Sequence, residues 1–137
     1  MKTKNIFSLL LILYISTLHS QCPGGSVYLN SQTDVDNFII DYPSCTEING
    51  NLQIYGSSNT DKISNLSGLT NIESITGLLS FNSFSTNINI NGLNNLKTTY
   101  EFSFSGLQNG FGLTGDFSNL ETINNYFLEK YGRLLGP

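Results

Sequence analysis

The feature that most constrains this chain is a repeat of 24 residues. Segments 65–75, 89–99 and 113–123 start 24 residues apart and carry apolar residues at matching positions. These positions are Leu69, Leu93 and Phe117, followed three residues later by Ile72, Leu96 and Leu120. A more divergent copy, 27 residues upstream, places Tyr42, Cys45 and Ile48 in the corresponding slots. A fixed period of this length is typical of proteins built by stacking similar units, so the sequence predicts about four stacked coils.

A short alternating segment follows each apolar motif, which is the pattern of a strand. Strands are expected at 51–55, 77–81 and 100–104, with a poorer fourth at 126–128. Because neighbouring side chains of a strand point to opposite faces, the inward pairs are Leu52 and Ile54, Leu79 and Phe81, and Phe102 and Phe104. In the third copy Thr99 takes the slot of Ile75. The first inward residue, Phe102, follows Thr99 by three residues, whereas Leu79 follows Ile75 by four. This slip predicts a bulge or a shortened turn.

An asparagine recurs with the repeat at Asn71, Asn95 and Asn119. In a stacked coil, an asparagine at one turn position can hydrogen-bond backbone groups that the turn leaves unpaired. We therefore interpret these three residues as structural and not as part of a binding site.

Residues 1–20 have the pattern of a signal peptide. Lys2 and Lys4 give a basic start, residues 6–18 are apolar, and Ser20 is a small residue before the expected cleavage at Gln21. The apolar run is short for a membrane-spanning helix, so no membrane insertion is expected after cleavage. An alternative is a lipoprotein signal acylated at Cys22, although the three residues before Cys22 fit that pattern poorly. Either reading predicts a secreted or cell-surface protein.

Removing this segment leaves four basic residues against ten acidic ones, a net charge of about −6. Nucleic acids and anionic lipids need a basic surface, so neither is an expected partner. The single histidine, His19, is lost with the segment. Without it, Ser-His-Asp and Cys-His catalytic machinery are absent. The sequence predicts no catalytic residue, no metal ligand and no cofactor.

Residues 21–47 are expected to form an N-terminal cap. An exported chain with two cysteines predicts one disulfide, Cys22–Cys45. Residues 26–29 are expected to form a strand, and an amphipathic helix is expected to begin at Ser31, with Asp34 in a capping-box arrangement, and to end at Pro43.

Two arrangements of carboxylates have a functional interpretation as well as a structural one. Asp34 and Asp36 resemble the start of a calcium loop, but the remaining ligands and the glycine turn are missing. Glu73 and Glu121 share one repeat slot, with Lys97 between them, which indicates a solvated ladder of charges. A polysaccharide-acting enzyme with paired carboxylates remains a remote alternative.

The cap, the phrase YPSCTEINGNLQI and the pattern N-L-x-G-L-x-x-I-x-x-I-x-G-x-L at 65–79 occur together and in order. With these features, residues 21–123 resemble the receptor L-domain family of leucine-rich-repeat-like proteins, most closely exported bacterial members. The resemblance implies a mainly β fold, a right-handed β-helix or solenoid with short parallel strands and a cap helix. It also implies extracellular recognition without enzymatic activity. Residues 48–123 would hold the repeats.

Residues 124–137 depart from the family pattern and are expected to be an irregular tail. Either the chain is a truncated member of the family, or the tail folds over the open end as a cap.

The outward strand positions carry the binding hypothesis. They form a polar, weakly charged face, suited to an extracellular protein or a glycan. The candidate residues are Asn51, Gln53, Tyr55, Ser80, Asn82, Glu101 and Ser103, with Leu78 and Ser105 beside them. The competing reading is a structural spacer, since solvent-facing strand positions are polar in any case. The chain is expected to be a monomer or part of a longer repeat array.

Overall fold

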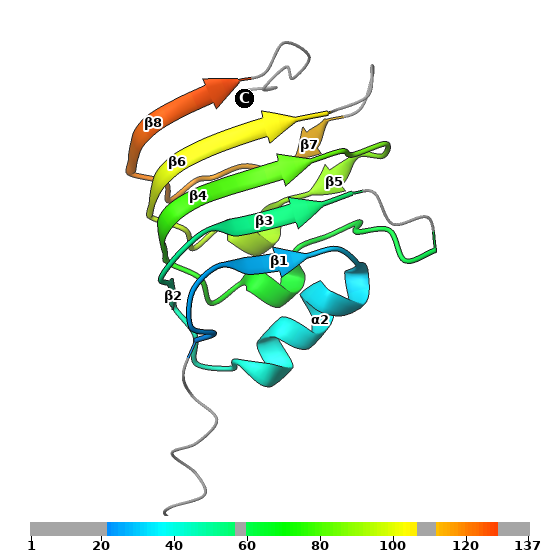
Figure 1. The fold of residues 1–137 in the computed structure, drawn as a ribbon, viewed down its shortest axis with the longest axis horizontal. Helices are drawn as coiled ribbons and strands as arrows, with labels where there is room; N and C mark the ends of the chain where they lie inside the picture. The colour runs from blue at the N-terminus through cyan, green and yellow to red at the C-terminus, as the bar shows by residue number, and fades with distance from the viewer. Residues whose placement is uncertain (1–21, 57–59, 107–111, 129–137) are drawn as a thin grey trace, which may run out of the picture.

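The computed structural model describes residues 22–56, 60–106 and 112–128, and side chains as far as Asn124. The expected signal peptide and residues 129–137 lie outside these ranges. Within them the protein is mainly β, as the sequence predicts. Five parallel strands lie side by side in the order β1-β3-β4-β6-β8, and a short sixth strand, β2, also pairs with β4 (Figure 1). The strands are β1 (Val27–Leu29), β2 (Glu47–Ile48), β3 (Leu52–Tyr55), β4 (Ser74–Asn82), β6 (Thr98–Ser105) and β8 (Thr122–Leu128).

A second layer of short elements lies behind this sheet (Figure 1). It consists of the helix α2 (Gln32–Asp41), the 3-10 helices η1 (Ser67–Leu69) and η2 (Asn91–Leu93), and a small parallel sheet of β5 (Ile88–Asn89) and β7 (Leu113–Thr114). The core fills the space between the layers. The six predicted inward side chains of β3, β4 and β6 are all buried, which confirms that part of the strand pattern. Phe81 stacks on Phe104, with ring centroids 5.2 Å apart.

The expected irregularity between the second and third copies is present. Ile75 pairs with Thr99 and Leu78 with Glu101, so β4 has one residue more than β6 in this interval. The extra residue forms a bulge in β4. Asn51 fixes it, because its side-chain oxygen accepts a hydrogen bond of 2.9 Å from the Leu78 N–H.

The fourth strand is longer than the sequence indicates. β8 begins at Thr122, four residues before the predicted start, and continues to Leu128. Its backbone pairs with β6 in parallel, with Phe102 opposite Tyr126. Residues 124–128 therefore belong to a strand and not to an irregular tail. Apolar and polar residues alternate only weakly in β8, but its backbone pairing with β6 extends the strand.

The predicted helix is confirmed as α2. Ser31 is its N-cap and accepts a hydrogen bond of 3.1 Å from the Asp34 N–H. The Asp34 carboxylate bonds the Asn30 N–H, one residue earlier than in a standard capping box. Val35 and Phe38 face the core. Among the described residues, no helix is long and apolar enough to cross a membrane.

Two glycines allow the second layer to stack closely. A Cβ at Gly68 would overlap the Val35 carbonyl of α2, and one at Gly92 would overlap the Leu66 carbonyl. Segment 113–123 has Asp116 in this slot. There the chain forms only a turn, and Phe117 and Leu120 are half-buried, whereas their counterparts in segment 89–99 are fully buried. Stacking is therefore looser at the end of the described chain.

We expect Gly92→Ala to lower the free energy of unfolding by about 1–3 kcal/mol, the usual cost of overpacking. Urea denaturation measures the change. Gly24→Ala is the control, because a Cβ at Gly24 meets nothing within 4 Å. Equal stability of the Gly92→Ala protein and the wild type would show that the close approach is not a constraint.

Cys22 and Cys45 form the expected disulfide, with a sequence separation of 23. It connects the start of the described chain to the segment before β2. Closing a loop of this size contributes about 3 kcal/mol in the chain-entropy model.

We expect the Cys22→Ser, Cys45→Ser double variant to lose about 3 kcal/mol of unfolding free energy in urea denaturation. Labelling of thiols in denatured, unreduced wild-type protein should find none, and two labelled thiols would contradict the pairing.

Candidate functional site

The outward side chains of β1, β3, β4 and β6 form one continuous surface, which we call the strand face. Its first row runs across the sheet through Tyr28, Gln53, Ser80 and Ser103, which are paired in register. Its second row contains Tyr55, Asn82 and Ser105, and its third contains Leu78 and Glu101. The sheet therefore brings together the predicted binding residues of β3, β4 and β6. Their role in binding remains a prediction.

Hydrogen bonds connect many of these side chains to one another. Tyr55 donates to Gln53 at 2.6 Å within β3, and Asn82 donates to Ser80 at 3.0 Å within β4. Ser105 donates to Asn82 at 2.6 Å across the strands. These bonds hold the polar groups in fixed positions, so the strand face is ordered before any ligand arrives.

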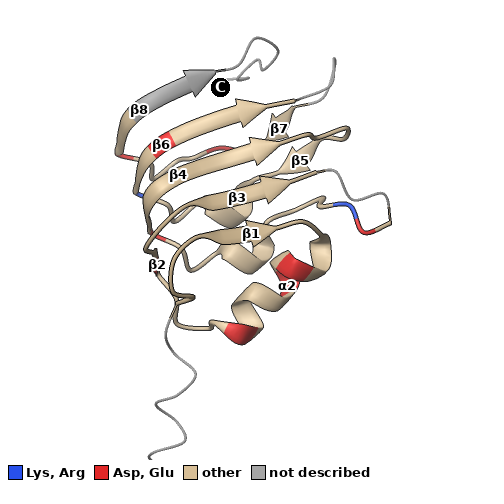
Figure 2. Ribbon diagram, viewed as in Figure 1, with Lys and Arg blue, Asp and Glu red and all other residues tan. Residues whose placement is uncertain are grey.

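The strand face carries very little charge. Figure 2 shows no charged residue on β1, β3 or β4, and Glu101 on β6 is the one acid among the candidate residues. A neutral face of amides, hydroxyls and tyrosines interacts with ligands through hydrogen bonds and ring contacts. Charge steering does not contribute appreciably there.

Two of the predicted residues are poorly placed for ligand contact. Ser80 is only 3% exposed, because it is small and lies between Gln53 and Ser103 of the flanking strands. The side-chain oxygen of Asn51 is used by the β4 bulge. Both residues therefore stabilise the strand face and are poorly placed to bind a ligand.

Two exposed tyrosines are missing from the predicted binding residues. Tyr28 is 55% exposed and Tyr100 is 52% exposed. The sequence does indicate Tyr28, because the apolar residues Val27 and Leu29 flank it in the expected strand, and alternation turns its side chain outward. Tyr100 lies in β6 between Thr99 and Glu101, next to the irregular interval, where alternation alone does not predict the direction of a side chain.

The repeated asparagines are structural, as the sequence indicates. Each donates from its side-chain nitrogen to a carbonyl of the preceding repeat. The bonds run from Asn71 to Pro43 at 2.8 Å, from Asn95 to Thr70 at 2.7 Å and from Asn119 to Asn94 at 2.7 Å. They join the turn of one repeat to the turn of the one before.

We expect Asn95→Ala to reduce the free energy of unfolding by about 1 kcal/mol, the usual net value of one hydrogen bond. Chemical denaturation tests this, with Asn124→Ala as a control, because Asn124 is exposed near the end of the described side chains. No loss in Asn95→Ala would mean that water replaces the bond without cost.

Several acidic residues outside the strand face have local partners. Lys97 forms an ion pair of 2.6 Å with Glu73, and both side chains are about half exposed. Glu73, and more weakly Glu121, raise the pKa of Lys97, consistent with the expected charge ladder. Asp34 caps α2, and Asp36 accepts a hydrogen bond from Gln32. The described residues contain no group of three or more acidic, histidine or cysteine side chains placed to hold a metal ion.

Residues 44–109 match the family model of the receptor L domain. The match covers a little under half of the chain and runs from just before β2 to just after β6. It includes the predicted binding residues on β3, β4 and β6. The expected resemblance to the receptor L-domain family is therefore confirmed over this segment. No match was found among curated proteins or among solved structures.

Proposed function

We propose that this protein is an exported, non-catalytic recognition module that binds an extracellular protein or a glycan on its strand face. The receptor L domain is a ligand-binding domain of extracellular type, and its model matches the segment that builds most of the strand face. The Cys22–Cys45 disulfide also suits an oxidising compartment. Export by a signal peptide at residues 1–20 belongs to the same proposal.

The proposed architecture is a right-handed solenoid of about four coils, of the kind found in exported bacterial members of the family. The parallel register of β1, β3, β4, β6 and β8 supports it. Each coil would contribute one strand to the large sheet and one turn to the second layer. Such a unit serves as a monomer or as part of a longer array, and several copies at a surface would raise a modest affinity through avidity.

The observation that carries the proposal is the pair of tyrosines at one end of the strand face. Tyr28 lies beside Gln53, and Tyr55 is two residues further along β3, so the two residues occupy diagonal positions on the sheet. Tyrosines give large, rigid contact area together with a polar group, which suits protein and sugar ligands. Ordered amides and hydroxyls surround them. Because Glu101 is the one acid of the candidate set, a largely uncharged ligand fits best.

We expect an array of glycans and extracellular proteins to yield a ligand whose affinity falls at least about ten-fold in a Tyr28→Ala, Tyr55→Ala double variant. Salt should change the affinity little, since charge contributes little. Ile40→Ala is the control, because Ile40 is 69% exposed on α2, away from the strand face.

Unchanged affinity in the double variant would move the site elsewhere on the molecule. Turnover of a polysaccharide would contradict the non-catalytic reading and favour the carboxylate alternative. A complete lack of binding would favour a structural spacer. The hydrogen bonds within the strand face support that second candidate, because they already occupy polar groups of Gln53, Tyr55 and Asn82.

A further inference from the structure

The first strand of the sheet has an open edge. Val27 donates a backbone hydrogen bond of 2.7 Å to Asn51, on the side of β3. In a parallel strand the N–H and C=O of the next residue point the other way, so the backbone of Tyr28 faces away from β3. Within the described ranges, no strand pairs with β1 on that side. An open edge of this kind accepts an additional strand.

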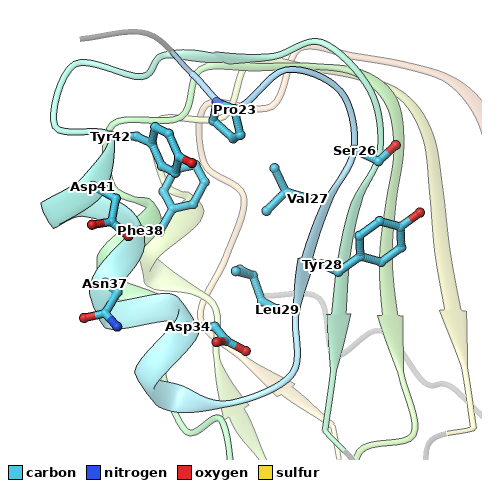
Figure 3. Close-up of a pocket in the computed structure, with 10 residues that line it drawn as sticks. All are labelled: Pro23, Ser26, Val27, Tyr28, Leu29, Asp34, Asn37, Phe38, Asp41 and Tyr42. Carbon is cyan, nitrogen blue, oxygen red and sulfur yellow. The ribbon is translucent and has the colours of Figure 1, made fainter. Parts of the chain in front are cut away.

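A groove runs along this edge, between β1 and α2. Its volume is about 260 Å³. Figure 3 shows Val27 and Leu29 pointing from β1 towards α2, with Phe38 and Tyr42 opposite them and Pro23 at one end. The side chain of Tyr28 points to the other side, towards the strand face. The floor of the groove is therefore apolar, and one wall is a strand backbone.

The helical wall of the groove is acidic. Asp34 lies towards Leu29 and Asp41 towards the other end, with Asn37 between them (Figure 3). Neither acid forms an ion pair within the part of the chain that the structure describes. The two acids are seven residues apart on α2, which corresponds to about 10 Å along a helix. In an extended peptide, side chains at positions 1 and 5 point the same way and are about 13 Å apart.

We propose that this groove binds an extended basic peptide, which adds as a strand to the free edge of β1. Basic side chains at positions 1 and 5 of the peptide reach Asp34 and Asp41. The apolar side chain at position 3 packs over Val27, Leu29 and Phe38. A second copy of this chain fits poorly, because its α2 would bring the same acids to the interface. The site is separate from the strand face, so it does not depend on the proposed function.

The test uses the peptide acetyl-Lys-Thr-Val-Thr-Lys-amide and isothermal titration of the full chain. Binding is expected, weakening as salt is added, and acetyl-Glu-Thr-Val-Thr-Glu-amide is not expected to bind. Asp41→Asn should weaken binding about three-fold, the range of a partly exposed ion pair. Asp36→Asn is the matched control. It removes the same charge from α2, but Asp36 bonds Gln32 and does not line the groove.

Two substitutions of one residue test the strand edge. Tyr28→Pro removes the N–H that points away from β3, a change that edge strands tolerate, and should weaken binding about ten-fold. Tyr28→Ala keeps the backbone and should bind the peptide like the wild type. Far-ultraviolet circular dichroism checks that each variant is folded.

Four results would overturn the proposal. They are no binding of the basic peptide at millimolar concentration, equal binding of the acidic peptide, equal effects of Asp36→Asn and Asp41→Asn, and undiminished binding to a folded Tyr28→Pro protein. Should Tyr28→Pro fail to fold, the comparison of Asp41→Asn with Asp36→Asn decides.

Discussion

The rest of the structure depends on how closely each repeat approaches the one before it. Parallel strands pair at about 4.8 Å, and the second layer must match that spacing for both to pair at once. At Gly68 and Gly92 no Cβ separates the turn from the preceding carbonyl. Asn71, Asn95 and Asn119 then hydrogen-bond the carbonyls of the preceding turns. The glycines permit neighbouring turns to approach closely. The asparagines then hydrogen-bond backbone carbonyls of the preceding turn.

The two ends of the described set of repeats differ as a result. At the first end α2 takes the place of a turn, the Val35 carbonyl lies against Gly68, and the disulfide connects the two ends of the cap. At the other end Asp116 replaces glycine, and Ile123 is 36% exposed, whereas Ile75 in the same slot is 1% exposed. The cap end is thus the more firmly packed of the two, and it presents both Tyr28 on the strand face and the acidic groove.

Much of this arrangement could be predicted from residue spacing. The inward pairs, the β4 bulge, the structural asparagines, the cap helix and the disulfide follow from the repeat and the cysteine count, because periodic burial leaves a periodic pattern. Other features could not. The length of β8 depends on pairing with β6, which its own sequence does not reveal. The burial of Ser80 depends on side chains from two neighbouring strands, and Asn51 bonds Leu78 across a bulge. The groove beside β1 needs the position of α2, which no local pattern supplies.

We propose that a largely uncharged, internally ordered strand face recognises a ligand. Chemical-shift mapping of the ¹⁵N-labelled protein, titrated with a ligand found on the array, tests it most directly. We expect the largest shifts in backbone amides of β1 and β3, around Tyr28, Gln53 and Tyr55, and in the side-chain amide of Asn82. The largest shifts on α2, with those strand residues unmoved, would contradict it.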